Sequence, residues 1–369
     1  DARLAAVGLQ LIDNPYAEHV AVALAGDMHE PVFGASREYA ALPRDADQAR
    51  ERWTREVAEN LERAKPLGGL PRHSQPFTGD PDGTPAQQAE YLPRVASGEL
   101  VMSFALTEPD AGSDAASLKT RADLAADGSH YVLNGTKRFI TNAPHAGMFT
   151  LMARTDPTNK GAGGVSSFIV DAKSPGISFG KYDKKMGQKG AHTCDVIFDN
   201  VKVPAANLIG LKEGQGFKTA MKVLEKGRIH IAAVAVGVAK RMLRDALAYS
   251  LERKQFGQAI GDFQLVQAML ADSQAELYAA ECMTLDAARR RDDGHNVSTE
   301  ASCAKMFATE MCGRVADRAV QILGGAGYME EYGIERFYRD VRLFRLYEGT
   351  TQIQQIIIAR NMVREARDA

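Results

Sequence analysis

One carboxylate near the end of the chain could do chemistry. Glu348 lies between Tyr347 and the small residues Gly349 and Thr350, in a segment that reads as a turn. A glutamate in a turn is usually solvated. If it faced an apolar cleft, desolvation would raise its pKa, and it could act as a general base near neutral pH. The segment therefore indicates proton abstraction, provided that tertiary structure supplies the cleft.

Two segments in the middle of the chain could contact a ligand. The stretch from Phe104 to Asp114 follows a short apolar run with glycine, serine and acids, so it can present N–H groups and hydroxyls to a polar group. Phe139 and Thr141 are two residues apart, so on a strand they share a face and could flank a flat ring. Taken alone, a strand-to-turn junction and a core phenylalanine explain these two segments better.

Two later segments could meet phosphates. Arg253, at the end of a predicted helix, can donate two parallel hydrogen bonds from its guanidinium to a phosphate. It can also simply be a cation that interacts with the helix dipole. The glycines between Gln321 and Tyr328 let the backbone approach a diphosphate closely. That segment lacks the GxGxxG pattern and ends a helix, so an ordinary C-terminal cap is the alternative.

The elements that must position these residues change along the chain. Residues 1–97 hold mixed helical patterns, and residues 98–210 hold short strands. Asp127-Gly128 predicts a turn, and Asn134-Gly135 predicts a β-hairpin. Closely spaced short strands of this kind indicate a β-barrel or sandwich.

Residues 211–369 have the 3.6-residue period of long amphipathic helices, which predicts an antiparallel bundle. We expect helices over Phe217 to Leu251 and Phe263 to Ala288. A third helix begins with Ser298 as its N-cap and ends at Leu323, because Gly324 and Gly325 follow.

Composition excludes several classes of protein. The 369 residues have a net charge of -2, so we expect no strong electrostatic field that would attract nucleic acid. The four cysteines form no CxxC pair and no histidine lies near them at metal-ligand spacing, so we expect buried free thiols and no metal site. No window approaches ~18 consecutive apolar residues, so no membrane span is predicted.

The order and spacing of the segments resemble the acyl-CoA dehydrogenase family, from about Thr84 to Ala366. Phe-Ala-Leu-Thr-Glu-Pro-Asp-Ala-Gly-Ser-Asp looks like the first family signature. Gln-Ile-Leu-Gly-Gly-Ala-Gly-Tyr, followed by Tyr-Glu-Gly-Thr, looks like the second. The resemblance implies an α+β fold with an N-terminal α-helical domain (1–97), a middle β domain (98–210) and a C-terminal four-helix bundle (211–369).

The resemblance also implies site residues. By this resemblance, Glu348 occupies the position of the family's catalytic base. FAD contacts are implied for Phe104, Leu106, Thr107, Gly112, Ser113, Phe139, Ile140, Thr141, Arg253, Gln255, Phe256, Phe263, Gln264, Gln321, Gly324, Gly325, Thr350 and Gln352, those from Arg253 to Gly325 reaching a neighbouring subunit. Acyl-CoA contacts are implied for Ser113, Glu225, Arg228 and Gly349.

The implied reaction converts an acyl-CoA thioester to the trans-2-enoyl-CoA. Glu348 would remove the α proton while the β hydride passes to flavin N5, and electron-transferring flavoprotein would reoxidise the flavin. The oxyanion would be met by a flavin ribityl hydroxyl and the backbone N–H of Glu348. One subgroup takes its base from the position just before Arg228. Here Lys226 and Gly227 precede Arg228, with no carboxylate at that position, which favours Glu348.

The family further implies a homotetramer that takes part in fatty-acid β-oxidation. Its location would be cytoplasmic in a bacterium and the mitochondrial matrix in a eukaryote. Two alternatives stay open: an oxidase on the same fold, which would form peroxide, and a catalytically silent relative, which would not bind FAD. Residues 1–83 depart from the family pattern, since only Gly68-Gly69-Leu70 remains of its Gly-rich turn.

Overall fold

The computed structural model describes residues 82–368. These residues form two compact units, one built on a β-sheet (82–184 and 191–223) and one built of helices (185–190 and 224–368). Of the predicted N-terminal α domain, helix α4 (Pro85–Ala96) lies within the described residues. It begins at a capping box in which Thr84 and Gln87 each bond the other's backbone N–H.

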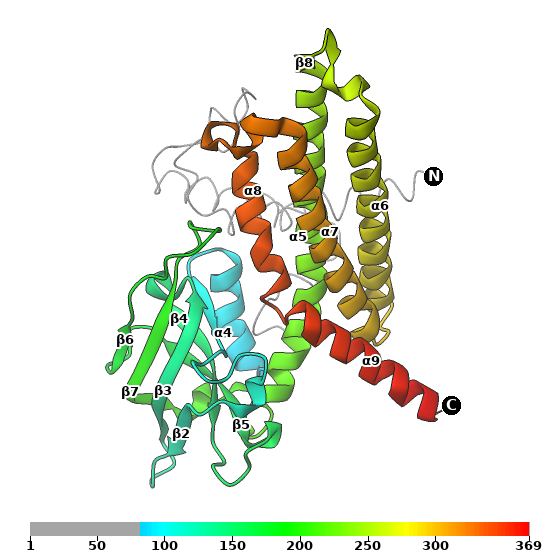
Figure 1. Ribbon diagram of the computed structural model, residues 1–369. Coiled ribbons are helices and arrows are strands. Elements are labelled where there is room, and N and C mark those ends of the chain that lie inside the picture. The colour runs from blue at the N-terminus through cyan, green and yellow to red at the C-terminus, as the bar shows by residue number, and fades with distance from the viewer. Residues whose placement is uncertain (1–81, 369) are drawn as a thin grey trace. The chain divides into compact units, whose positions relative to one another are not determined.

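A seven-stranded sheet organises the described part of the β unit (Figure 1). Its strands are β1 (Met102–Ala105), β2 (Arg121–Leu124), β3 (His130–Thr141), β4 (Met148–Arg154), β5 (Val165–Asp171), β6 (Ile177–Phe179) and β7 (Thr193–Pro204). The order is β1-β4-β2-β3-β7-β6, and β5 pairs with β4. β4 runs parallel to β1, and β3 runs antiparallel to both β2 and β7.

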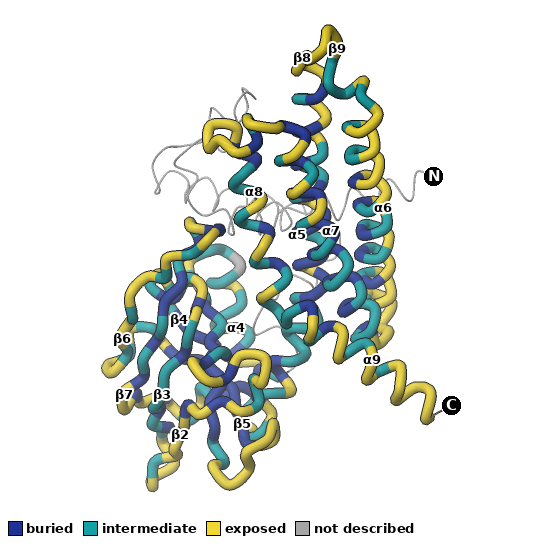
Figure 2. Tube along the Cα trace, in the orientation of Figure 1, coloured by how far each residue is buried: buried dark blue, intermediate teal, exposed yellow. Residues whose placement is uncertain are grey.

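The core of this unit lies along its central strands, as the dark tube of Figure 2 shows. Every residue of β4 is buried, which is typical of a strand covered on both faces. Phe149 and Leu151 of β4 pack in one cluster with Phe168 of β5 and Leu133 of β3. The predicted strands are thereby confirmed as parts of one core.

One of the two predicted turns is correct. Gly128, at φ +71°, turns the chain between β2 and β3. The hairpin predicted at Asn134-Gly135 is wrong, because both residues lie inside β3. The pairing of β3 with β7 shifts register there, and a Cβ on Gly135 would lie 2.5 Å from Thr120 Oγ1. Gly135 therefore serves a β-bulge and a close approach of side chains.

The helical unit is built on three long helices: α5 (Gly216–Glu252), whose first residues belong to the β unit, α6 (Gln264–Asp292) and α7 (Ser298–Leu323). The short strands β8 (Lys254–Gln255) and β9 (Gln258–Ala259) join α5 to α6, and the helices α8 (Ile334–Val341) and α9 (Thr351–Asp368) follow α7. These bounds confirm the predicted long helices. Many buried positions are alanines, which let the helices pack closely.

Two local expectations need correction. The N-cap of α7 is Val297 rather than Ser298, whose backbone N–H instead donates to Asn296 Oδ1 at 3.1 Å. Cys194 and Cys312 are buried as expected, but Cys282 is exposed. Gly324 ends α7 at φ +61°, as predicted.

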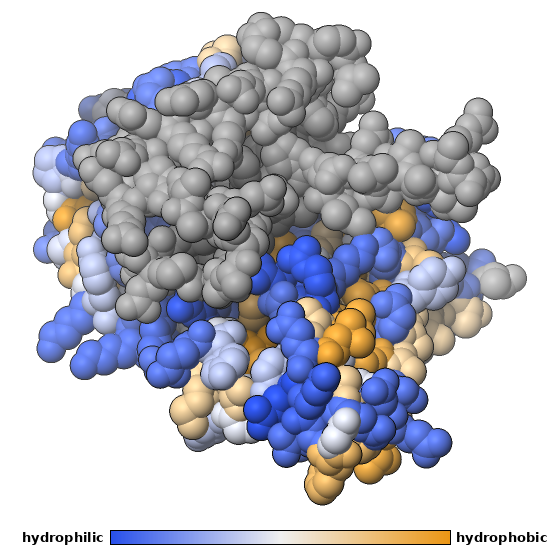
Figure 3. Space-filling view, turned by 90° about the horizontal axis from the view of Figure 1, so that it is seen from above, coloured by the Kyte–Doolittle hydropathy of each residue, from blue (hydrophilic) through white to orange (hydrophobic). Residues whose placement is uncertain are grey.

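The surface of the described residues is mixed in character. Figure 3 shows one face, on which apolar side chains lie in small groups among hydrophilic ones. Among residues 82–368, no helix combines the length and the apolar character needed to cross a bilayer.

Candidate active site

Glu348 lies in a left-handed turn between α8 and α9. Its φ is +54°, and that of Gly349 is +86°. A left-handed conformation costs a residue other than glycine roughly 1–3 kcal/mol, so it persists only where surrounding contacts hold it. Such strain is most often found at functional sites.

Two fully buried side chains hold the turn through its carbonyl oxygens. Lys305 Nζ, from α7, donates to Gly349 O at 2.8 Å. Gln354 Nε2, from α9, donates to Glu348 O at 3.2 Å and to Gly349 O at 3.0 Å. Both side chains are 0% exposed. Neither residue was predicted as part of the site.

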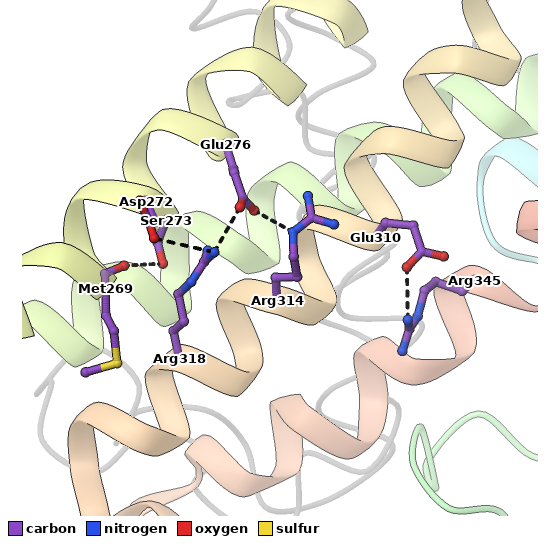
Figure 4. Close-up of polar contacts among 8 residues, drawn as sticks. All are labelled: Met269, Asp272, Ser273, Glu276, Glu310, Arg314, Arg318 and Arg345. Carbon is purple, nitrogen blue, oxygen red and sulfur yellow. Dashed lines mark hydrogen bonds and ion pairs between the residues drawn. The ribbon is translucent and has the colours of Figure 1, made fainter. Parts of the chain in front are cut away.

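A second residue of α7 fixes the two ends of the turn. Glu310 accepts a hydrogen bond from Arg345 Nη1 at 2.9 Å and another from Thr351 Oγ1 at 2.7 Å. Figure 4 shows the pair of Glu310 and Arg345, beside the ion pairs of Glu276 with Arg314 and Arg318 that join α6 to α7. Helix α7 therefore anchors the Glu348 segment before, within and after its apex.

The carboxylate of Glu348 points at α5. A Cβ added to Gly227 would lie 2.5 Å from Glu348 Oε2, so only glycine leaves the present position of the carboxylate free. Oε2 is buried and has no hydrogen-bond partner among the described residues, and the same holds for Nε of the neighbouring Arg228. Unsatisfied buried polar atoms of this kind are typical of a ligand or catalytic site.

Burial controls the acidity of Glu348. Desolvation raises its pKa to about 7, although the positive charges of Lys305 and Arg228 oppose the rise. Burial likewise lowers the pKa of Lys305 to about 8. Near neutral pH the carboxyl can therefore both accept and release a proton, which is the requirement for a general acid–base group. The carboxylate of Glu348 is therefore buried, unlike that of the solvated glutamate that is usual in a turn.

The β unit brings together the two middle segments. Arg138 N–H donates to Thr107 O at 2.8 Å, so the segment around Phe139 lies against the one that begins at Phe104. Phe139 sits at φ +58° in a bulge of β3 and is 62% exposed, whereas the next residue, Ile140, is buried. Thr141 is exposed, and so are Gly112 and Ser113, while Leu106 is buried. The strained, outward-facing Phe139 fits a flat ring laid on this surface.

A buried ion pair that sequence reasoning missed ties these segments together. Lys137 is 0% exposed and donates to Leu106 O at 3.0 Å and to Glu108 Oε1 at 2.8 Å. Glu108 also accepts the backbone N–H groups of Lys119 and Thr120. A signal was available, because Lys137 keeps the alternation of the buried Tyr131 and Leu133 along β3.

The predicted phosphate-side residues lie at one end of the helical unit. Arg253, Gln255, Gln264, Gln321, Gly324 and Gly325 are exposed there, as is Phe256 at 94%, whose ring meets that of Phe263. Tyr249 contacts Tyr332, which brings the end of α5 beside the segment that follows α7 (Figure 1).

This group is separate from Glu348 within one chain. Arg253 follows the end of α5, whereas Arg228 lies in the first half of the helix, roughly 37 Å away at ~1.5 Å per residue. A single chain therefore does not bring the two groups together.

The predicted substrate residues fall into two sets. Arg228 and Gly349 lie beside Glu348, and the charge of Glu225 acts on Arg228, whose pKa is lowered by burial. Ser113 belongs to the β unit. Thr350 caps α9 through its Oγ1, which accepts from Ile353 N–H, and Gln352 is exposed. No cluster of three potential metal ligands occurs within residues 82–368.

Two family models match the chain. Residues 103–201 match the middle domain of acyl-CoA dehydrogenase, and residues 214–363 match its C-terminal domain. A relative from Acetobacterium woodii, the "Caffeyl-CoA reductase-Etf complex subunit CarC", is 46% identical over 75% of this chain and 72% of its own length.

Solved structures agree with these matches. The butyryl-CoA dehydrogenase of Megasphaera elsdenii is 35% identical at a TM-score of 0.76, over 94% of this chain and 89% of that one. A structure of PigA with FAD and proline is 32% identical at a TM-score of 0.73, over 76% and 72% of the two chains.

Proposed function

This chain belongs to the acyl-CoA dehydrogenase family, and we propose that it oxidises an acyl-CoA thioester to the trans-2-enoyl-CoA with Glu348 as its base. FAD is the cofactor of this family, and when bound it accepts at N5 the hydride that leaves the β carbon. The chain's own residues bind and orient the thioester, and Glu348 removes its α proton.

One observation carries the choice of base: Glu348 Oε2 is buried, without a hydrogen-bond partner among the described residues. The α proton of a thioester is weakly acidic, so a base with a pKa near 7 matches the task better than a solvated carboxylate would. Negative charge that develops on the thioester oxygen needs donors in place beforehand. We assign one of them to the backbone N–H of Glu348.

The remaining sites follow the same assignment. Phe139 would lie against the flavin ring and Thr141 would bond its edge, supported by the exposure of both residues. The exposed group around Arg253 and Phe256 would meet the FAD of a neighbouring subunit, supported by its distance from Glu348 along α5. These grounds support an oligomer, and the family resemblance makes a homotetramer the assembly that we propose.

Electron-transferring flavoprotein is the proposed electron acceptor, because the relative CarC is named as a subunit of an Etf complex. If the source is bacterial, we propose a cytoplasmic location. Fatty-acid β-oxidation is the proposed pathway class.

Reduction of an enoyl-CoA is the second candidate, favoured by the word reductase in the name of CarC. It uses the same residues in reverse, with protonated Glu348 returning a proton to the α carbon. A pKa near 7 leaves both protonation states of Glu348 populated at neutral pH, so it suits either direction.

A substrate panel tests the proposal. Purified FAD-loaded protein would be mixed without oxygen with acyl-CoAs from short to long and branched, and bleaching of the flavin absorbance followed. We expect at least one acyl-CoA to bleach the flavin. If none does at any chain length while enoyl-CoAs reoxidise the reduced protein, the reductase assignment replaces it. Rapid peroxide formation in air would indicate an oxidase.

The base is tested in the same assay. Glu348→Gln should keep FAD and bind acyl-CoA but reduce the flavin about 10³-fold more slowly, since it lacks the proton acceptor. Glu365→Gln, on the exposed face of α9, is the matched control and should reduce normally. Normal reduction by Glu348→Gln would remove Glu348 as the base.

A further inference from the structure

Lys305 is a fully buried lysine without a carboxylate of its own. Among residues 82–368, none lies within ion-pair distance of its ammonium, which instead donates to Gly349 O at 2.8 Å. Removing an ammonium from water costs several kcal/mol, and one neutral carbonyl offsets only part of that cost. A stabilising role for the fold does not explain why a cation is placed here.

The position of Lys305 suggests a role at the turn that it contacts. Gln354, also 0% exposed, donates to the same carbonyl oxygen and to that of Glu348. We propose that Lys305 and Gln354 are positioning residues for Glu348. Their hydrogen bonds hold the left-handed turn so that the carboxylate of Glu348 stays against Gly227. This proposal rests on the proposed role of Glu348 as the base.

The backbone geometry explains why the two donors can control the position of the Glu348 carboxylate. A turn at φ +54° relaxes toward negative φ when nothing holds it, and that change redirects the Cα–Cβ bond of Glu348. Glu310 fixes the chain on either side through Arg345 and Thr351, but it makes no hydrogen bond to residues 348 or 349 within the described chain. The apex is therefore held by Lys305 and Gln354.

Lys305 also acts through its charge. Two helices and the turn itself place charged or titratable groups around Glu348: Arg228 and Glu225 from α5, Lys305 and Glu310 from α7, and Arg345 and Tyr347 from the turn segment. Lys305 is the cation that most strongly opposes the raised pKa of Glu348. Its removal should move the pH profile of proton abstraction to higher pH.

The test uses FAD-loaded Lys305→Met, which keeps the volume of the side chain and removes both donor and charge. With a saturating acyl-CoA, we expect flavin reduction about 10²-fold slower, because small misplacements of a reacting group have effects of this size. FAD content and KM should stay near those of the parent protein. The apparent pKa of the reduction rate should rise by roughly one unit.

Lys240→Met is the matched control. Lys240 forms an ion pair with Glu281 between α5 and α6, away from the turn, and its loss should leave the reduction rate and pH profile unchanged. A Lys305→Met protein that reduces at the parent rate, with an unmoved pH profile, overturns the proposal. A structural role alone would lower stability without moving the profile, and that outcome also counts against it.

Two further variants keep the result interpretable. If Lys305→Met does not accumulate as folded protein, Gln354→Leu removes the other donor, and it should slow reduction at least about tenfold with FAD still bound. Unchanged reduction there overturns the proposal. If Glu348→Gln reduces normally, the base assignment itself fails. If Glu348→Gln is inactive and Lys305→Met is normal, only the positioning role fails.

Discussion

The two units of the protein each bury a lysine completely, and they use it differently. Lys137 in β3 and Lys305 in α7 are both 0% exposed, and burial lowers the pKa of each to about 8. Lys137 lies 2.8 Å from the carboxylate of Glu108. Lys305 contacts a backbone carbonyl and acts on Glu348 only through space. Lys137 neutralises the carboxylate of Glu108, whereas Lys305 leaves the carboxylate of Glu348 available.

The two carboxylates respond in opposite directions. Burial raises the pKa of Glu108, but the charge and hydrogen bond of Lys137 and the N–H groups of Lys119 and Thr120 outweigh it, so the pKa is lowered. Within residues 82–368 Glu348 Oε2 has no such donors, and the pKa of Glu348 rises to about 7. Hydrogen bonding, more than burial, therefore separates a structural carboxylate from one that can serve as a base.

The largest effect should follow from breaking the structural pair. Lys137→Met leaves Glu108 buried without its cation, which should lower the free energy of unfolding by about 3–5 kcal/mol. Denaturant unfolding measures the loss. Lys119→Met, which removes an exposed ion pair with Asp110, is the control and should cost less than ~1 kcal/mol. Equal small losses for both variants would contradict the distinction drawn between them.

A smaller effect is expected from crowding the free carboxylate. Gly227→Ala places a methyl group 2.5 Å from Glu348 Oε2, too close for the carboxylate to keep its position, so flavin reduction should slow by about 10- to 100-fold. Gly237→Ala is the matched control on the same helix, because a Cβ there meets nothing within 4 Å. The control should reduce normally and gain up to ~1 kcal/mol of stability. Parent-like reduction by Gly227→Ala would show that the carboxylate can act from another position.

The pH dependence sharpens the same contrast. Glu348 must be ionised to accept a proton, so the reduction rate of the free enzyme should fall about tenfold per unit as pH drops below about 7. Stability should respond oppositely at the two carboxylates. Because the pKa of Glu348 is raised, its contribution to the free energy of unfolding falls as pH rises from about 4.5 to 7. Because the pKa of Glu108 is lowered, its contribution to the free energy of unfolding falls only as pH drops below about 4.5. A rate that is flat between pH 5 and 8 would contradict the first expectation.

The smallest effect should come from the partly exposed network between α6 and α7. Glu276 pairs with Arg314 and Arg318 at 2.9 Å each (Figure 4). Glu276→Gln should cost less than about 1 kcal/mol, since partly exposed ion pairs are well screened. Thermal unfolding at low and high salt checks this, with the difference shrinking at high salt. A loss as large as that of Lys137→Met would place this network among the structural pairs.

Much of the fold is local in origin and could be predicted. The 3.6-residue period set the long helices, and Gly324 ended α7, because these depend on neighbours in sequence. Local rules failed where tertiary contacts overrode them. Asn134-Gly135 lies in a bulge because β7 pairs along all of β3, and Ser298 does not cap α7 because Asn296 engages its N–H.

The sequence by itself determined the helices, the short strands, the family signatures and the identity of Glu348 as the carboxylate to examine. Only the tertiary structure decided that this glutamate is desolvated, because the residues that surround it come from α5, α7 and α9. Lys305, Gln354 and Gly227 carry no local signal of their roles. A pKa depends on water and charge within a few ångströms, and residues distant in sequence supply both.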